Sequence, residues 1–147
     1  MHKNNIIHRD LHTKNILVQI KNFKPIVKIA DFGRSSYASS SGLDNSDAFT
    51  EPKLLRELDG NSYNLDEKSD IYSMSVILWE ISSKRPPFES VQQNDLILRI
   101  IGGERERFRE GTPSEYKRIY ELCWNDDPQS RPSVSEARRM FNVFLKT

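Results

Sequence analysis

Cysteine is nearly absent from this chain of 147 residues, in which Cys123 is the only one. A single cysteine cannot form an intrachain disulfide, and this excludes a small secreted fold held together by disulfides. Long apolar runs are also lacking, because the longest, residues 76–79, is far shorter than the roughly 20 residues that span a bilayer. No signal-like apolar core follows residues 1–5. We therefore expect a soluble, cytoplasmic or nuclear protein with no membrane partner.

A large excess of charge of one sign is missing as well. The chain has 22 Lys and Arg against 21 Asp and Glu, which gives a formal net charge of +1. Proteins that bind the phosphate backbone of nucleic acids usually carry a strong basic excess. Nucleic acid is therefore not an expected partner, and a helix-turn-helix DNA-binding protein is disfavoured. With 36% hydrophobic and 29% charged residues, the composition is that of one folded domain.

The N-terminal third contains two β-rich segments, residues 16–18 and 26–29, joined by the turn-prone residues 21–25. This pattern predicts a short β-hairpin. Residues 33–48 are rich in Ser, Gly, Asp and Asn, a composition that is typical of an exposed loop. Too few of them are apolar to contribute to a core.

Apolar spacing and helix stop signals predict helices in most of the remaining chain. The expected helices are a short one from Leu54 to Leu58 that ends before residues 60–62, then 66–83, 91–101, one that opens at 112–113, and 133–145. The helix at 66–83 is apolar on nearly all sides, which indicates a buried position. Five side chains are expected in the core or on a buried helix face: Trp79, Ile119, Leu122, Cys123 and Trp124. The predicted fold is mostly α with a small β-hairpin.

Two acidic residues and an amide frame the predicted hairpin. The first motif reads His-Arg-Asp-Leu-His-Thr-Lys-Asn at residues 8–15, so that Asp10 precedes Asn15 by five positions. The second, Asp-Phe-Gly at residues 31–33, follows the predicted end of the hairpin. Each motif alone is a weak signal. This order, with a hairpin between the motifs, matches the catalytic loop and the magnesium-binding loop of protein kinases.

Later segments strengthen the resemblance to protein kinases. They read Ser-Asp-Ile-Tyr-Ser at residues 69–73, Cys-Trp at 123–124 and Asp-Pro-Gln-Ser-Arg-Pro at 127–132. The phrases HRDLHTKNIL, WEISSKRPPF and ELCWNDDPQSRPS are most similar to the tyrosine-kinase-like branch. Residues 1–147 resemble a truncated large, C-terminal kinase lobe of the α+β class. This partial domain would run from the catalytic loop to the last helix, with an activation loop at about 34–50.

The resemblance implies an ATP-dependent phosphotransferase that uses Mg²⁺ and acts on a protein substrate. In such enzymes catalysis rests on positioning the acceptor hydroxyl and neutralising phosphate charge. Asp10 would orient that hydroxyl and accept its proton, while Asn15 and Asp31 offer the hard oxygen ligands that Mg²⁺ prefers. Lys14 would reach the transferred phosphate, although a solvent-facing lysine is a simple alternative. Leu17 would form the floor beneath the adenine of ATP.

By the same resemblance, Arg9 would pair with a phosphorylated activation loop and so order it. The loop offers several serines, Tyr37 and Thr50 as acceptors, and the sequence does not choose among them. Whether the substrate hydroxyl belongs to Ser/Thr or to Tyr also stays open. The lysine of Ser/Thr kinases is replaced by His12, yet Ser46 keeps a hydroxyl in the substrate-docking stretch, which favours Ser/Thr.

Structural roles are implied for four side chains: His8, Phe32, Asp70 and Arg131. Asp70 would lie under the catalytic loop and accept hydrogen bonds from the backbone near His8 and Arg9. A helix N-cap, which is the ordinary role of such an aspartate, is compatible with that position.

One element departs from the family pattern. The usual Ala-Pro-Glu reads Glu-Pro-Lys at residues 51–53. The family glutamate pairs with an arginine that corresponds to Arg131, but Lys53 has the same sign of charge and would repel it. Glu51 is therefore the alternative partner for Arg131. A Lys53→Glu substitution that brings no gain in stability would favour this alternative.

The sequence contains no glycine-rich phosphate loop, strand lysine or partner glutamate of the kinase kind. We therefore expect a kinase domain that consists of the large lobe without the N-terminal lobe. This polypeptide should have little or no kinase activity by itself. Without these elements ATP would be poorly positioned, and a misplacement of about 1 Å between reacting groups can lower the rate by ~10²-fold. The second hypothesis is a non-catalytic binding or scaffold module that docks partners through the helices at 91–101 and 133–145. Retention of Asp10, Asn15 and Asp31 favours the enzyme, and no oligomeric state is indicated.

Overall fold

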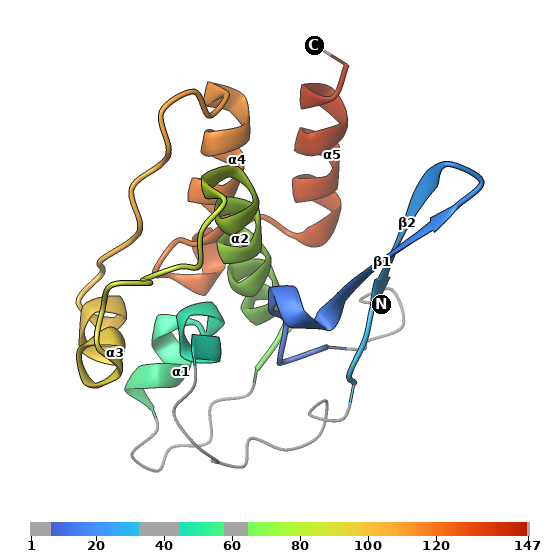
Figure 1. Ribbon diagram of the computed structural model, residues 1–147. Coiled ribbons are helices and arrows are strands. Elements are labelled where there is room, and N and C mark those ends of the chain that lie inside the picture. The colour runs from blue at the N-terminus through green and yellow to red at the C-terminus, as the bar shows by residue number, and fades with distance from the viewer. Residues whose placement is uncertain (1–6, 33–44, 58–64, 147) are drawn as a thin grey trace.

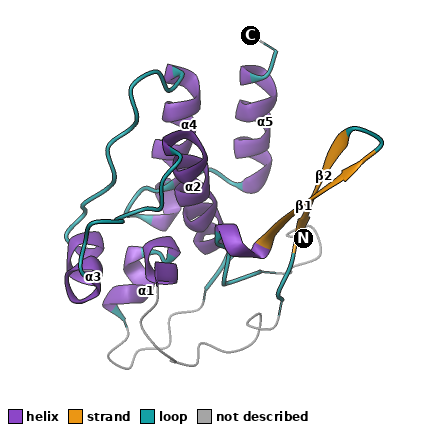
Figure 2. Cartoon of the chain, in the orientation of Figure 1, coloured by secondary structure: helices purple, strands orange, loops and turns teal. Residues whose placement is uncertain are grey.

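A helical body carries one β-hairpin in the computed structural model, which describes residues 7–32, 45–57 and 65–146 (Figure 1, Figure 2). The hairpin consists of β1 (Ile16–Lys21) and β2 (Lys24–Ile29). The helices are α1 (Pro52–Arg56), α2 (Glu67–Ser83), α3 (Gln93–Ile101), α4 (Ser114–Cys123) and α5 (Val134–Phe144). Short 3₁₀ helices lie at Thr13–Asn15, Asn45–Phe49 and Pro128–Ser130. The prediction of a mostly helical fold with a small hairpin is confirmed.

Helix α2 lies at the centre of the body (Figure 1). Its start is fixed by a capping box, in which the Asp66 carboxylate accepts from the backbone N–H of Lys68 at 2.8 Å. In return, the hydroxyl of Ser69 accepts from the backbone N–H of Asp66 at 3.3 Å. The helix is buried over most of its length, as its apolar composition predicts, and it ends at Lys84 in the left-handed conformation.

The helical body is built by packing α4 against α2, and α5 against α4. Trp79 of α2 is fully buried and Trp124, just after α4, is buried as well, so both belong to the core as predicted. Helix α5 begins with a second capping box, between Ser133 and Glu136. Its buried Ala137 and partly buried apolar neighbours pack on the side of α4 that carries Ile119.

On α4 the predicted buried face is wrong in one position. Ile119 and Cys123 are buried, but Leu122 is 39% exposed. At 3.6 residues per turn, the buried stripe runs from Ile119 towards Tyr120, whereas Leu122 lies about 60° away on the other side of Ile119. Apolar character alone did not locate the edge of the stripe.

The two strands pair in antiparallel register from Ile16 opposite Ile29 to Lys21 opposite Lys24. Only Asn22 and Phe23 form the turn, with φ of 51° and 60°. A pair of residues with positive φ matches the right-handed twist of the strands, so two residues suffice to reverse the chain. The turn predicted at 21–25 was therefore too long, and its outer residues belong to the strands.

Several predicted boundaries move by one or a few residues. Helix α3 begins at Gln93 rather than 91, and Pro113 precedes α4 as its N-cap. The prediction of an exposed loop as far as residue 48 is wrong at its last residue, because Ala48 is buried. Residues 33–44 of the predicted loop, and Leu58 with 60–62, lie outside the described residues. Within the described ranges, no helix combines the length and apolar character needed to cross a membrane.

Candidate active site

The segment that contains His8 and Arg9 is attached to the body by the carboxylate of Asp70. Asp70 lies in the first turn of α2 and is 2% exposed. Its Oδ2 accepts from the backbone N–H of His8 and its Oδ1 from that of Arg9, each at 2.9 Å. The structure thus has the contact that the resemblance implies. The most buried helix of the protein fixes the backbone directly before Asp10.

The imidazole of His8 links the same segment to the base of the hairpin. It is fully buried, and its Nε2 lies 2.9 Å from the carbonyl oxygen of Ala30, to which it donates. Its Nδ1 accepts from the backbone N–H of Asp10 at 3.4 Å, and its ring lies 4.9 Å from that of Phe32. The backbone N–H of Ala30 donates to the carbonyl of Asn15 at 2.8 Å. These bonds hold the two ends of the hairpin together.

Asn15 ends the 3₁₀ helix Thr13–Asn15 and is 7% exposed. Its Nδ2 donates to the carbonyl oxygen of Asp10 at 2.8 Å and lies 3.1 Å from Nε2 of His12. The same Nε2 is 3.9 Å from Oδ2 of Asp10. Asp31 directly follows Ala30, the residue paired with Asn15. The fold therefore gathers Asp10, Asn15 and Asp31 at the base of the hairpin.

Two residues of this region have a left-handed backbone, Arg9 with φ of 68° and Asp31 with φ of 58°. This conformation costs a residue with a side chain roughly 1–2 kcal/mol, and it persists only where neighbouring contacts hold it. Asp70 holds the N–H of Arg9, and both polar groups of Ala30 are bonded directly before Asp31. Strain of this kind concentrates at functional sites.

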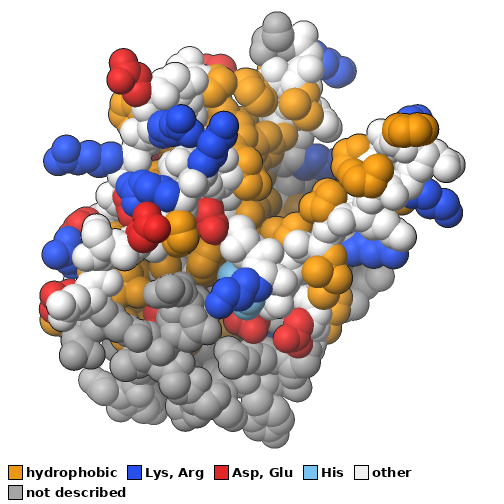
Figure 3. Space-filling model, viewed as in Figure 1, with side chains coloured by type: hydrophobic (Ala, Val, Ile, Leu, Met, Phe, Trp, Pro, Cys, Tyr) orange, Lys and Arg blue, Asp and Glu red, His pale blue; other side chains and the backbone are white. Residues whose placement is uncertain are grey.

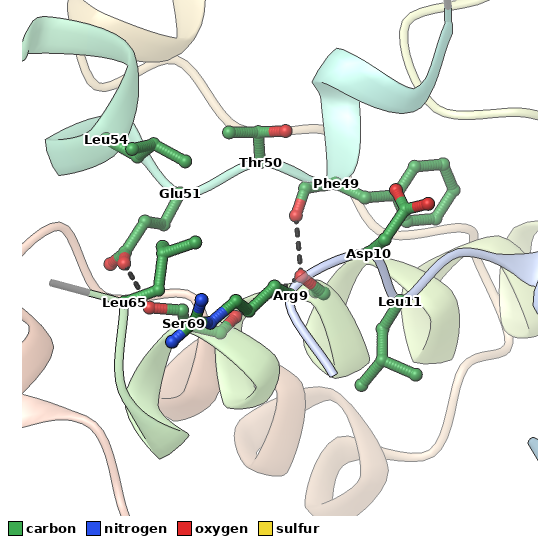
Figure 4. Close-up of a pocket in the computed structure, with 10 residues that line it drawn as sticks. Arg9, Asp10, Leu11, Phe49, Thr50, Glu51, Leu54, Leu65 and Ser69 are labelled. Carbon is green, nitrogen blue, oxygen red and sulfur yellow. Dashed lines mark hydrogen bonds between the residues drawn. The ribbon is translucent and has the colours of Figure 1, made fainter. Parts of the chain in front are cut away.

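A small pocket opens beside Asp10 (Figure 4). Its lining residues come from the catalytic-loop segment, the stretch around α1 and the start of α2: Arg9, Asp10, Leu11, Phe49, Thr50, Glu51, Leu54, Leu65, Ser69 and Ser73. The hydroxyl of Ser73 donates to the carbonyl of Phe49 at 2.8 Å. In Figure 4 the side chain of Glu51 points toward the hydroxyl of Ser69, which donates to it. The pocket is therefore lined by both polar and apolar side chains.

Glu51 forms a buried ion pair with Arg131. Its Oε2 accepts from Nη1 of Arg131 at 2.6 Å, and both side chains are almost completely enclosed. The same Nη1 donates to the carbonyl of Lys68 at 2.9 Å. Lys53 is exposed and does not share this buried position. Of the two arrangements considered from the sequence, the structure contains the one in which Glu51 takes the place of the family glutamate.

The side chains of the remaining candidate residues are exposed or lie outside the description. Lys14 is exposed in the 3₁₀ helix Thr13–Asn15, and Leu17 of β1 is 53% exposed. Arg9 is exposed, and most of the activation loop with which it would pair lies outside the described residues. Ser46 lies in the 3₁₀ helix Asn45–Phe49, and its side chain is outside the description.

Sequence reasoning missed two residues at this site. His12 contacts Asn15 directly, and the Thr13 side chain near Glu80 of α2 acts to lower the pKa of the Glu80 carboxyl. The larger effect is burial, which raises the pKa of Glu80, while Thr13 and attraction to His12 act in the opposite direction. The position of His12, two residues after Asp10, was the available signal. Nothing in the sequence placed Glu80 beside the loop.

The donor chemistry of the site fits Mg²⁺. The carboxylate of Asp31 and the amide oxygen of Asn15 are hard oxygen donors. In the part of the chain that the structure describes, no three His, Cys, Asp or Glu residues form a metal-binding group. Mg²⁺ in phosphate-transfer sites is usually held by one or two protein oxygens together with phosphates and water, so two donors are enough.

Two comparisons with known proteins gave matches. The family model described as protein tyrosine and serine/threonine kinase matches residues 1–141. The dual specificity protein kinase shkD of Dictyostelium discoideum is 35% identical over 95% of this chain and 19% of its own length. A probable LIM domain-containing serine/threonine-protein kinase of the same organism is 33% identical over 92% of this chain and 20% of its own length. Human receptor-interacting serine/threonine-protein kinase 1 is 33% identical over 98% of this chain and 24% of its own length. The chain thus spans about a fifth of the length of these relatives.

Proposed function

Because the chain belongs to the protein tyrosine and serine/threonine kinase family, we propose that it transfers the γ-phosphoryl group of ATP to serine and threonine hydroxyls of protein substrates. Two of the relatives named above are serine/threonine kinases, which supports this choice of hydroxyl. One relative is a dual specificity kinase, so tyrosine is the alternative acceptor. ATP and Mg²⁺ would be the cofactors.

The proposed place of this chain in a kinase is the large, C-terminal lobe of the tyrosine-kinase-like branch. Residues 1–147 would run from the catalytic loop to the last helix, with the activation loop at about 34–50. The mostly helical body and the hairpin formed by the described residues support this assignment. We also propose that the protein works in the cytoplasm.

The observation that carries the proposal is the set of hydrogen bonds at the base of the hairpin. Through Asp70, His8 and Asn15, these bonds connect the backbone around Asp10 to Asn15 and to Ala30, the residue before Asp31. Asp10 would orient the acceptor hydroxyl and take its proton. Asn15 and Asp31 would hold Mg²⁺, which neutralises charge on the phosphates.

Other residues would complete the nucleotide and regulatory contacts. Lys14 would reach the transferred phosphate, and exposed Leu17 would lie beneath the adenine. Arg9 would bind a phosphorylated activation loop, and Ser46 would contribute to docking of the substrate. A glycine-rich phosphate loop and a strand lysine do not occur in the 147 residues. We therefore expect this segment alone to turn over ATP slowly or not at all, because the triphosphate is poorly positioned.

The test is a kinase assay on the protein isolated from its own cells, with labelled ATP and a generic protein substrate. Asp10→Asn should lower kcat by about 10²–10⁴, the range for a lost general base. Arg118→Gln, an exposed change on α4, should leave kcat unaltered. Equal activity of Asp10→Asn and wild type would reject the proposed mechanism. Label found only on tyrosine would reject the Ser/Thr choice, and absence of turnover in the wild type would favour the binding-module hypothesis.

A further inference from the structure

One atom of the Asn15 side chain, the amide nitrogen Nδ2, lies beside two possible hydrogen-bond acceptors. Its Nδ2 lies 2.8 Å from the carbonyl oxygen of Asp10 and 3.1 Å from Nε2 of His12. A backbone carbonyl can only accept, so the group opposite it must be the NH₂ of the amide and not its oxygen. If the amide were turned over, two oxygens would meet at this short distance. The Asp10 carbonyl therefore sets the orientation of the Asn15 amide.

The protonation site of His12 follows from this orientation. Since Nδ2 of Asn15 can only donate, Nε2 of His12 must be the bare nitrogen that accepts, and the proton of the neutral ring is on Nδ1. Both hydrogens of the Asn15 amide are then bonded. Among residues 7–32, 45–57 and 65–146, no group forms a hydrogen bond with the other polar atom of that side chain, Oδ1, in a residue that is 7% exposed.

We propose that His12 is a positioning residue: as the Nδ1–H tautomer, it is the second acceptor that locks the Asn15 amide and presents Oδ1 as the metal ligand. The part that concerns metal rests on the proposed function, whereas the tautomer and the amide orientation do not. Partners that orient a metal ligand through its second polar atom typically change metal affinity by about 10- to 100-fold when they are lost.

His8 lies in the same loop and provides a comparison with His12, because its hydrogen bonds require the proton on the other ring nitrogen. Nε2 of His8 lies 2.9 Å from the carbonyl of Ala30 and must donate, while its Nδ1 accepts from the backbone of Asp10. His8 is therefore the Nε2–H tautomer. Two histidines four positions apart should differ in the nitrogen that carries the proton.

Long-range ¹H–¹⁵N correlation spectra of the chain, recorded where the imidazoles are neutral, test this directly. The chain has three histidines, and the His12 signals are assigned by their loss in His12→Gln. The expected result is a bare Nε2 in His12 and a protonated Nε2 in His8. A proton on Nε2 of His12 would overturn the proposal, since Asn15 could not then donate to it. This readout requires no metal, nucleotide or activity.

Variants separate the positioning role from the proposed function. His12→Leu removes the acceptor and should free the Asn15 NH₂ signals, whereas His12→Gln can accept through Oε1 and should keep them in place. In Mn²⁺ titrations with ATP, His12→Leu should bind about 10- to 100-fold more weakly than wild type, and His12→Gln should stay within a few-fold. Equal amide spectra for wild type and His12→Leu would overturn the proposal. If wild type binds no Mn²⁺ while the tautomers are as expected, the metal function fails and the orientation of Asn15 by His12 stands.

Discussion

The helical body and the hairpin bury their apolar residues very differently. In the body, Trp79, Ile100 and Tyr120 are completely enclosed. On the hairpin, Val18 is 61% exposed and Phe23 is fully exposed. Figure 1 shows the hairpin extending away from the helices, and Figure 3 shows hydrophobic side chains along its surface. The body holds itself together by burial, whereas the hairpin depends on its ladder and on the contacts at its base.

The register places most of the exposed apolar side chains on one face of the hairpin. This face carries Ile16, Val18, Ile20, Pro25, Val27 and Ile29. The candidate site lies where the hairpin joins the body: Asp10 follows backbone anchored by Asp70, and Asp31 follows the last residue paired with the loop. Changes in the body should therefore alter stability, and changes at the junction should alter both stability and the site.

The largest effect is expected in the body, at the buried pair of Glu51 and Arg131. Arg131→Met removes the cation and leaves the Glu51 carboxylate buried beside the Ser69 hydroxyl. Breaking one partner of a buried ion pair typically costs about 3–5 kcal/mol. Urea unfolding of the chain should show a loss of that order relative to wild type.

Two variants sharpen this prediction. The double variant Glu51→Leu/Arg131→Met should recover part of the loss, because no buried charge remains unpaired. Lys53→Glu should bring no gain, because Lys53 is exposed and Glu51 already pairs with Arg131. A loss below about 1 kcal/mol for Arg131→Met would be expected only of a surface pair, and it would contradict this arrangement.

A smaller effect is expected at the junction, from Asp70→Asn. Asn keeps one acceptor oxygen but turns an NH₂ group towards a backbone N–H, so one of the two bonds to His8 and Arg9 is lost. Hydrogen bonds to a charged group contribute about 1.5–3 kcal/mol. Hydrogen exchange should accelerate at the amides of His8 and Arg9. The matched control is Asp66→Asn on the same helix, which keeps a good N-cap and should be nearly neutral.

A still smaller, pH-dependent effect is expected on the surface of the body. The Arg56 guanidinium donates to Asp126 at 2.9 Å and lowers the pKa of that carboxyl below its ordinary value of 3.8. A lowered pKa means that the folded state binds fewer protons than the unfolded state. The stabilisation is therefore complete above 3.8 and is lost as the pH falls through the folded pKa. Because the pair is partly exposed, its size should not exceed about 1 kcal/mol.

The measurement is the difference in unfolding free energy between wild type and Asp126→Asn as a function of pH. It should be constant near neutral pH and shrink below 3.8. A difference that grows in acid would reverse the predicted sign. Added salt should reduce the difference near neutral pH, since partly exposed charges are screened.

Local signals account for what the sequence predicted well. The predicted starts of α2 and α5 at Asp66 and Ser133, and the apolar composition that indicates a buried α2, depend on residues close together in the chain. The candidate residues Asp10, Asn15 and Asp31 came from motif order, and their grouping at the hairpin base required a hairpin of the expected kind. The residues that determine these features lie close together in the chain, so the features could be predicted from the sequence without a structure.

Long-range choices could not be decided in the same way. Glu51 and Arg131 are 80 positions apart, and the sequence left Lys53 and Glu51 as competing neighbours of the arginine. The contact of His12 with Asn15 depends on the tight 3₁₀ turn between them, and no sequence motif predicted that turn. The turn of the hairpin was predicted, but its length was not, because left-handed φ at a phenylalanine is unfavourable and gives no signal in the composition.

That phenylalanine gives the smallest global effect and the most direct test of whether the hairpin is energetically separate from the body. Phe23 has φ of 60° and a fully exposed side chain, so Phe23→Gly removes a steric cost and almost no burial. The hairpin should gain about 1 kcal/mol, seen as slower hydrogen exchange in β1 and β2. Asn22→Gly should gain less, because Asn tolerates the left-handed region. The urea midpoint of the whole chain should not move, since the hairpin opens before the body unfolds. A matching rise in global stability would mean that the two regions unfold as one unit.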